Sequence, residues 1–221
     1  MRGYDGVVEE QLRELAGRLR GPARLKAELI VELRHALSDA AEAYEEGGLP
    51  ATEAQRRAVA EFGTPAQLAP AYQAELAAGA LRGLSVRALA VAVVLVVAGD
   101  LSWKGSSWSA GPPPPDGYLL LSASLNWIWA AVAGLGVAGL VTAAAAARRG
   151  QVGVPGGRLL GWGLTGALGT GAVAGVALFA WSLGLWDAAL TWPPMIVCAV
   201  LVGGAFVLLG RAARTWLTTA R

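Results

Sequence analysis

The sequence predicts an all-α protein in which a small N-terminal four-helix module precedes a four-helix transmembrane bundle. Residues 1–80 hold 13 of the 16 acidic residues and have a formal charge of −4, whereas residues 81–221 hold only 3 acidic residues and have a charge of +6. Apolar residues follow helical spacing in the first part and form long uncharged runs in the second. We therefore expect one domain at 1–80 and another at 81–221.

The composition also indicates which kinds of site to expect. The excess of basic residues comes from arginines that flank apolar segments, so it does not indicate a nucleic-acid partner. One cysteine, Cys198, and one histidine, His35, are too few for a multi-cysteine metal site. MRGYDGVVEE has no apolar signal-peptide core, so the first domain is expected in the cytoplasm. We predict no cofactor and no metal.

The first two helices follow from spacing and from two breaks. Val8, Leu12, Leu15 and Leu19 form one helical stripe before Gly21-Pro22 ends it. The second helix is predicted over 22–46, with Pro22 in its first turn and Gly47-Gly48 as its stop. Its apolar face consists of Leu25, Leu29, Leu33, Ala36, Leu37, Ala40 and Tyr44.

The third and fourth helices meet at the best-specified turn of the chain. A helix over 52–62 is predicted to end at Gly63 in the left-handed conformation. The next helix opens with Thr64-Pro65-Ala66-Gln67, which fits a capping box. Pro70 lacks the N–H that a helix interior needs, so we expect it to kink or interrupt this helix.

Two stretches of this module carry a family resemblance: LRGPARLKAELIVELRHALSDAAEAYEEGGL and EAQRRAVAEFGTPAQLAPAYQAEL. Their most specific pieces are Arg20-Gly21-Pro22, Glu32-Leu33 with Asp39-Ala40, and Glu61-Phe62-Gly63 followed by Pro65 and Leu68. Residues 7–77 resemble the actinobacterial permease prefix domain (permease prefix domain 1) and the related HAAS helical signalling domain, which is found beside PadR-type transcription regulators. Pro50 departs from this pattern, because a Ser or Thr is expected to cap the third helix.

The resemblance implies a cytoplasmic helical module in front of transmembrane segments, and it implies no catalytic, cofactor-binding or metal-binding residues. The residues agree with a chain that is not an enzyme. His35 lies mid-helix among charged neighbours and is expected to be solvated, as are the carboxylates that follow helical spacing near basic residues. Cys198 lies in an apolar run and is expected to pack as a small apolar residue.

Four apolar segments follow, with helices predicted near 84–103, 123–147, 159–186 and 188–210. The last three lie in uncharged runs of 30, 28 and 23 residues, each longer than the ~20 residues that cross a bilayer. Only 12 residues separate Arg87 from Asp100 in the first segment. That segment spans if Arg87 reaches back to the inner interface and residues 100–103 form the outer one.

The distribution of charge favours four passes. Four passes place eight arginines on the inner side: Arg82, Arg87, Arg148, Arg149, Arg158, Arg211, Arg214 and Arg221. Lys104 is then the only basic residue on the outer side, where Asp100, Asp116 and Asp187 also lie. This bias predicts a multi-pass protein of the plasma membrane with both termini in the cytoplasm.

Tryptophans and small residues suggest how the bundle meets lipid and how its helices meet each other. Seven tryptophans are predicted at or near the outer interface: Trp103, Trp108, Trp127, Trp129, Trp181, Trp186 and Trp192. We expect them to form an aromatic belt, and the alternative is a cluster that stacks on a ligand. Trp162 and Trp216 are predicted near the inner interface. Small-residue ridges predict close packing within one chain, or else a dimer seam, at Gly163, Ala167, Gly171 and Gly175 and at Ala130, Gly134, Ala138 and Thr142.

The outer loop is predicted at about 101–124, with GPPPPDG at 111–117 as a stiff polyproline spacer. It serves as a simple connection or, alternatively, as a sensor surface.

These features predict a membrane-anchored regulatory or signalling protein whose helical domain docks a cytoplasmic protein partner, for example a PadR-like regulator. The alternative is an accessory or membrane subunit of an ABC-type transporter. The chain has no G-x-x-x-x-G-K-[ST] phosphate loop, so a separate chain would supply the ATPase. Homo-oligomers remain open in both interpretations. A membrane enzyme is the third interpretation, without a set of catalytic side chains to support it.

Overall fold

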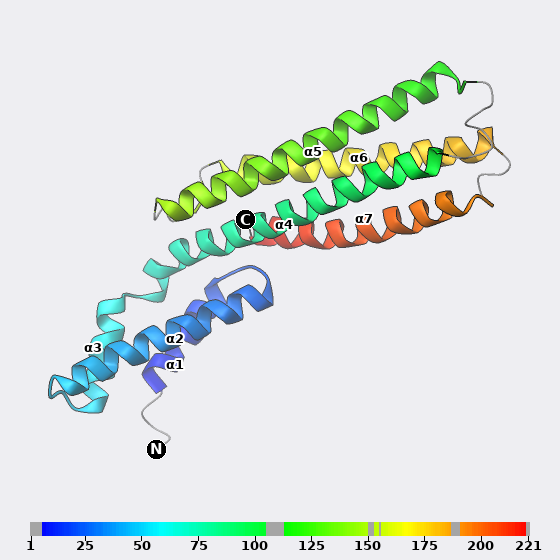
Figure 1. Ribbon diagram of the computed structural model, residues 1–221. Coiled ribbons are helices and arrows are strands. Elements are labelled where there is room, and N and C mark those ends of the chain that lie inside the picture. The colour runs from blue at the N-terminus through cyan, green and yellow to red at the C-terminus, as the bar shows by residue number, and fades with distance from the viewer. Residues whose placement is uncertain (1–5, 105–112, 150–152, 155, 187–190, 220–221) are drawn as a thin grey trace.

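The computed structural model describes residues 6–104, 113–149, 153–154, 156–186 and 191–219. Within these ranges the chain is all-α. Its helices are α1 (Gly6–Arg18), α2 (Ala23–Glu46), α3 (Ala51–Phe62), α4 (Pro65–Trp103), α5 (Asp116–Arg148), α6 (Gly157–Leu185) and α7 (Pro193–Thr219). The last four are long and apolar enough to span a membrane. A small helical module followed by a four-helix transmembrane bundle is thus confirmed (Figure 1).

The predicted stripes of the first helices form the core of the module. Val8, Leu12, Leu15 and Leu19 are all buried, as their spacing predicts. They pack with buried leucines of α2 and with one leucine of α4, namely Leu29, Leu33, Leu37 and Leu76. The module core therefore includes the first part of α4 and is not complete without it.

The turns of the module agree with the predictions in part. The capping box is confirmed, because Thr64 Oγ1 accepts from the Gln67 N–H and the Thr64 N–H donates to Gln67 Oε1. Pro22 is the N-cap of α2 and not part of its first turn. Gly63 has φ 97° and ψ 171°, so it has the positive φ that favours glycine but not the predicted left-handed helical conformation.

Helix α4 crosses from the module into the bundle without a break. Its 39 residues include Pro70, so of the two predicted effects of this proline, a kink or an interruption, the interruption does not occur. The first membrane segment was predicted as a separate helix near 84–103, but it is the second part of α4. Residues between the two parts are mostly Ala and Leu, which favour helix, so nothing local ends it. The domain boundary expected at residue 80 falls inside this helix.

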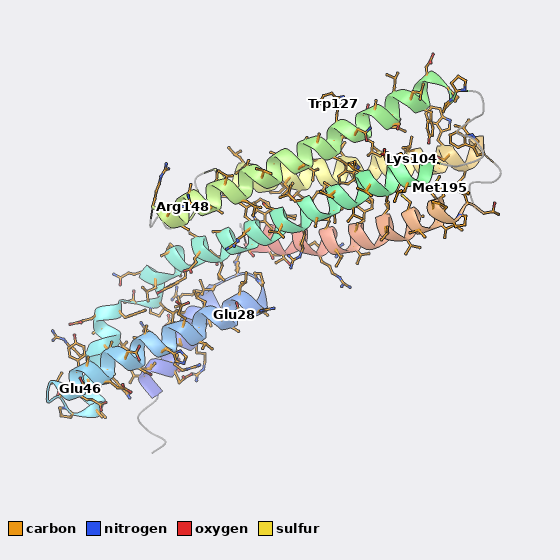
Figure 2. The ribbon with its side chains drawn as sticks, in the orientation of Figure 1. Glu28, Glu46, Lys104, Trp127, Arg148 and Met195 are labelled. Carbon is orange, nitrogen blue, oxygen red and sulfur yellow. The ribbon has the colours of Figure 1, made fainter. Side chains whose placement is uncertain are left out.

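The four long helices run alternately up and down (Figure 1). One end of the bundle lies next to the module and contains the end of α5, the start of α6 and the end of α7; we call it the module end. The other end, the distal end, contains the end of α4, the starts of α5 and α7, and the end of α6. Arg148 lies at the module end, whereas Lys104 and Met195 lie at the distal end (Figure 2).

Two bundle helices differ from their predicted bounds. Helix α5 begins at Asp116 and not near 123, because Asp116 lies in its first turn, where a carboxylate stabilises the helix dipole. Helix α7 begins at Pro193 and not at 188, and it continues past Gly210 to Thr219. Arginine favours helix, so Arg211 and Arg214 end the apolar run without ending α7.

The predicted outer loop at 101–124 is correspondingly shorter. Its proline run is described only from Pro113 to Pro115, and Pro115 has the polyproline values φ −56° and ψ 148°. Trp108, Asp187, Arg221 and the first residues of GPPPPDG lie outside the described residues.

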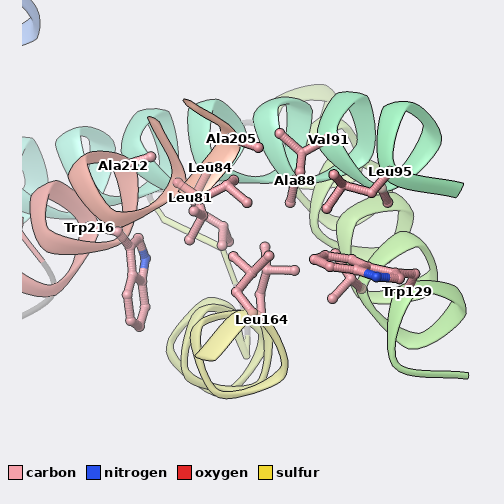
Figure 3. Close-up of a cluster of buried hydrophobic side chains, with 14 of the residues drawn as sticks. Leu81, Leu84, Ala88, Val91, Leu95, Trp129, Leu164, Ala205, Ala212 and Trp216 are labelled. Carbon is pink, nitrogen blue, oxygen red and sulfur yellow. The ribbon is translucent and has the colours of Figure 1, made fainter. Parts of the chain in front are cut away.

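The bundle core lies where α4 meets the other three helices (Figure 3). Leu81 and Leu84 of α4 lie beside Leu164 of α6, and all three are nearly inaccessible. Helix α7 packs mainly on α4, whereas α5 packs on both α4 and α6. Outward positions are instead apolar and exposed, as lipid contact requires: Val93, Leu120, Val141, Leu159, Val173 and Val200.

Glycines do bring helices together, but mostly at positions outside the predicted ridges. A Cβ added at Gly136 of α5 would lie 2.9 Å from Leu89 Cγ of α4, and a Cβ added at Gly139 would lie 2.5 Å from Ser85 Oγ of α4. In the predicted ridges, Gly171 faces Trp129 and Ile128 closely, whereas a Cβ at Gly134 or Gly175 would meet nothing within 4 Å. Within this chain α5 therefore approaches α4 through Gly136 and Gly139 and not through the predicted ridge, whereas the dimer-seam alternative for that ridge stays a prediction.

The tryptophans divide between the surface and the core. Trp127 is 78% exposed and points outward, whereas Trp129 is 5% exposed and belongs to the core (Figures 2 and 3). Residues two apart lie about 200° apart around a helix, so these two cannot share a belt. Trp216 is also buried, with its ring edge-on to Trp162 at a centroid distance of 5.9 Å. The belt prediction is therefore wrong for Trp129, and Trp216, which was predicted near the inner interface, is a core residue and not a lipid-facing one.

Candidate functional site: a distal cavity and the junction of module and bundle

An apolar cavity of about 360 Å³ lies in the distal half of the bundle. All four long helices contribute to its wall, because α6 and α7 make few contacts with each other there and leave a space beside α4 and α5. Its lining side chains include Leu95, Leu125, Trp129, Val176, Leu178, Phe179, Met195, Cys198, Ala199, Val202 and Phe206. Four glycines also line it, and three of them, Gly99, Gly175 and Gly203, have open space around the position of a Cβ.

Polar groups of the cavity wall lie towards the distal end. Tyr118, at the start of α5, and Ser182, near the end of α6, are both buried, and their hydroxyl oxygens are 3.0 Å apart in a hydrogen bond. The Tyr118 ring is also edge-on to Trp181 and Trp186, at centroid distances of 6.0 and 5.4 Å. Gly117 allows this contact, since a Cβ there would lie 2.9 Å from the Trp181 ring. The distal end of the cavity is thus fixed by an ordered aromatic and hydroxyl cluster.

A second, wider groove lies between α4 and α5 and shares part of this wall. Leu95, Leu125 and Trp129 separate it from the first cavity. Asp100 and Lys104 form an ion pair of 3.2 Å at its distal end. The first cavity is therefore apolar along the bundle and polar where the bundle ends, whereas the lining of the groove also includes Ser122 and Asn126 of α5.

The junction between module and bundle depends on one side chain, Gln73 of α4. Its Nε2 donates to the carbonyl oxygens of Arg20 and Thr219, at 2.8 and 2.7 Å, and its Oε1 accepts from the Arg20 N–H at 2.8 Å. Arg20 lies between α1 and α2, whereas Thr219 is the last residue of α7. One amide thus connects the module, α4 and the end of the chain's last helix.

Packing at this junction is close. Gly21 has φ 154°, and a Cβ there would lie 3.3 Å from the Thr219 side chain. Thr219 is buried, and its hydroxyl donates to the Thr215 carbonyl of its own helix. The module therefore contacts the end of α7 directly and is not attached to the bundle by α4 alone.

Ion pairs on the module stabilise its internal arrangement. Glu9 of α1 accepts two hydrogen bonds from Arg34 of α2, at 2.6 and 3.1 Å, and these hold the pKa of Glu9 below its ordinary value. Hydrogen bonds from Tyr44 and Arg57 likewise lower the pKa of Glu61. Both pairs are exposed to solvent, and both partners of each pair belong to the module. They favour the charged form of the two carboxyl groups but do not indicate a reactive site.

An acidic stripe runs along the exposed face of α2. Six exposed residues follow 4-3-4-3-4 spacing, and five of them are carboxylates: Glu28, Glu32, His35, Asp39, Glu42 and Glu46. Glu28 lies near the bundle and Glu46 at the opposite tip of the module, so the stripe follows the length of the helix (Figure 2). We call this surface the α2 acidic face.

The side chains singled out by the sequence do not form a reactive site in the described part of the chain. His35 is exposed on α2, as predicted, and Cys198 is half-buried in the cavity wall of α7. Among the described residues, no group of three or more His, Cys, Asp or Glu side chains could hold a metal ion.

Sequence reasoning did not identify Gln73, Tyr118 or Ser182 as important. Their partners lie far away in sequence, at separations of 53 to 146 residues for Gln73 and 64 for the hydroxyl pair. A Gln in a helix and a Tyr near a membrane interface are both common, so no local signal distinguishes them.

No protein-family model, no curated protein and no solved structure matches this chain.

Proposed function

We propose that this protein is a membrane-anchored regulatory or signalling protein whose helical module docks a cytoplasmic protein partner. The observation that carries the proposal is the α2 acidic face: an exposed row of five carboxylates, of which Glu28 pairs with Arg24, on a module joined to a transmembrane bundle through both α4 and α7. Because α4 is one helix across the boundary, a protein held by the module would be held at a defined position beside the membrane.

The distribution of charge supports a cytoplasmic module. Arginines of the bundle lie towards the module end, including Arg148 and Arg158, whereas Lys104 lies at the distal end beside Asp100. Positive residues mark the cytoplasmic side of membrane proteins. We therefore propose a multi-pass protein of the plasma membrane with both described ends of the chain in the cytoplasm.

The acidic face supports a partner with a basic surface. Charge complementarity accelerates encounter and selects between partners. DNA-binding proteins have such basic surfaces, and the resemblance of residues 7–77 to HAAS domains associates this kind of module with PadR-type regulators. The proposed partner is therefore a basic transcription regulator, and the protein itself binds no nucleic acid directly.

In-cell photo-crosslinking tests this proposal. A photoreactive amino acid is placed at Glu28 or Glu42 on the α2 acidic face, or at Arg57 on α3 for comparison, and crosslinked proteins are identified by mass spectrometry. We expect a basic regulator to be captured from Glu28 and Glu42 and much less from Arg57. An ATPase or permease at the same positions would instead favour the transporter alternative, and no crosslinked protein at all would contradict docking.

A charge-reversal pair provides the matched control. Glu32→Lys with Glu42→Lys reverses the α2 acidic face, whereas Glu10→Lys with Glu53→Lys changes the same net charge at exposed sites on α1 and α3. The first pair is expected to abolish capture and the second to preserve it. An equal loss of capture in both double variants would show that partner binding depends on the net charge of the module and not on the α2 acidic face.

A further inference from the structure

We infer that the distal cavity binds one acyl chain of a membrane phospholipid. The inference concerns the bundle and does not rest on the function proposed for the module. It follows from the chemistry of the cavity wall, its size, its opening between α6 and α7, and the position of its polar groups.

The wall excludes water and favours a hydrocarbon. Its side chains are leucines, valines, phenylalanines and methionine along the bundle, with hydroxyl groups only at the distal end, where Tyr118 and Ser182 bond to each other. A water molecule needs two to four polar partners, so an apolar cavity of this kind stays dry. A dry and empty cavity leaves its wall without dispersion contacts on one side.

The size fits a chain and excludes a helix. A methylene group takes roughly the ~30 Å³ of a water molecule, so 360 Å³ holds on the order of ten methylenes. A helix about 10 Å wide needs on the order of 120 Å³ for each 1.5 Å of its length, so the same space holds about three residues of one. A transmembrane helix from a second copy therefore cannot occupy the cavity.

The opening of the cavity faces the lipid, so acyl chains are the molecules that can enter it. Gly203 is exposed and yet lines the cavity, as do the exposed Val176 and Phe179, so the cavity opens on the outer surface between α6 and α7. That surface faces the lipid of a transmembrane bundle, where acyl chains are the abundant apolar molecules. The hydroxyl pair lies at the distal end, since Tyr118 is in the first turn of α5 and Ser182 in the last turn of α6, and the end of a membrane-spanning helix is where a phospholipid changes from chain to polar headgroup.

The test uses the full chain in vesicles of phosphatidylcholine and phosphatidylglycerol. A small fraction of the phosphatidylcholine has a diazirine in the middle of one acyl chain, and labelled residues are mapped by mass spectrometry after illumination. We expect label on wall residues of α6 and α7 such as Phe179, Cys198 and Val202, well above the label on outward residues such as Val173 and Val200.

Glycine variants distinguish the cavity from general lipid contact. Gly203→Leu and Gly175→Leu each place a side chain in the open space of the cavity, since a Cβ at either position meets nothing within 4 Å. Gly204→Leu on α7 and Gly166→Leu on α6 add the same group at positions that are equally open but do not line the cavity. We expect wall labelling to be lost in the first pair and unchanged in the second.

The thermal unfolding midpoint in detergent identifies any variant that does not fold. If only one of Gly203→Leu and Gly175→Leu folds, that variant is enough to test whether filling the cavity removes the label. Label that is spread evenly over wall and outward residues would overturn the inference. Wall labelling that survives both cavity-filling variants, or crosslinks between two copies of the chain at the wall, would overturn it as well.

Discussion

Ser85 is fully buried where α4 meets α5, and its hydroxyl has no hydrogen-bond partner. Gly139 of α5 faces it so closely that an added Cβ would lie 2.5 Å from Ser85 Oγ and 3.5 Å from Ser85 Cβ. The oxygen, and not the backbone, therefore sets how small residue 139 must be. A buried unpaired hydroxyl costs about 1–3 kcal/mol of stability, so the contact between Ser85 and Gly139 does not maximise the stability of the bundle.

We predict that Gly139→Ala lowers the free energy of unfolding by about 1–3 kcal/mol, because the new methyl group overlaps the hydroxyl. Ser85→Ala alone is expected to be neutral or stabilising, since it removes an unpaired polar atom. In the Ser85→Ala background the remaining separation is an ordinary contact, so Gly139→Ala should then be tolerated. A double-mutant cycle by thermal unfolding in detergent measures this coupling, and equal effects of Gly139→Ala in both backgrounds would contradict it.

Gly161 of α6 shows a second residue-scale constraint. A Cβ at this position would overlap the indole ring of Trp216, which is 1% exposed and belongs to the bundle core. At Gly163, two residues away, a Cβ would be 3.7 Å from the nearest atom of Leu135, an ordinary contact.

We predict that Gly161→Ala destabilises the full chain by about 1–3 kcal/mol in spite of the better helix propensity of alanine. Gly163→Ala is the matched control and is expected to leave stability unchanged or slightly improved. Thermal unfolding of both variants in the same detergent measures the difference. Equal midpoints would mean that Trp216 moves aside without loss.

At the scale of elements, the Glu9–Arg34 pair joins α1 to α2 across 25 residues of sequence. The hydrogen bonds from Arg34 place the pKa of Glu9 below its ordinary value, so the folded state favours the carboxylate. The pair therefore contributes stability above the ordinary carboxyl pKa of about 4.3 and loses it as the pH falls through the lower folded value.

We predict that Glu9→Gln lowers stability at pH 7 by about 0.2–1 kcal/mol, the range for exposed pairs, and that wild type and variant converge in acid. Glu42→Gln removes the same charge from an exposed position of α2 and is the control. Thermal midpoints of the full chain from pH 7 to below pH 4 provide the measurement. A constant difference between wild type and Glu9→Gln across this range would contradict the assignment.

Element ends show where local sequence is a sufficient guide. The capping box at Thr64 and Gln67 is local in sequence, and it was predicted correctly. The start of α5 and both ends of α7 were predicted wrongly, because a charged residue shows where a segment leaves the membrane and not where its helix ends. Arg211 and Arg214 continue α7 towards Trp216 and Thr219, and those contacts stabilise its last turns.

At the scale of the whole molecule, Gln73 determines how closely the module is coupled to the bundle. Its three hydrogen bonds connect the Arg20 turn, α4 and the end of α7. Since α7 also lines the distal cavity through Met195 and Cys198, one helix extends from the cavity wall to the module.

We predict that Gln73→Ala raises the rate of amide hydrogen exchange about tenfold in the last turn of α7 and around Arg20, because about 1 kcal/mol is lost for each hydrogen bond. Gln11→Ala is the matched control. Gln11 donates to the Gly63 carbonyl at 2.6 Å, so its loss should affect the α3–α4 turn and leave α7 unchanged. Unchanged exchange at 216–219 in Gln73→Ala would show that packing alone holds this junction.

The sequence by itself determined the all-α fold, the two-part organisation and the inward stripes of the module, because these depend on local spacing and on the separation of charged from apolar residues. It left open which face of each membrane helix meets its neighbours, since lipid-facing and buried positions are both apolar in a bundle. Trp127 and Trp129 illustrate this: the two residues look alike in sequence, and only the packing of α5 separates them. The unbroken α4, the Gln73 junction and the distal cavity were decided by tertiary structure, because each joins residues that are far apart along the chain.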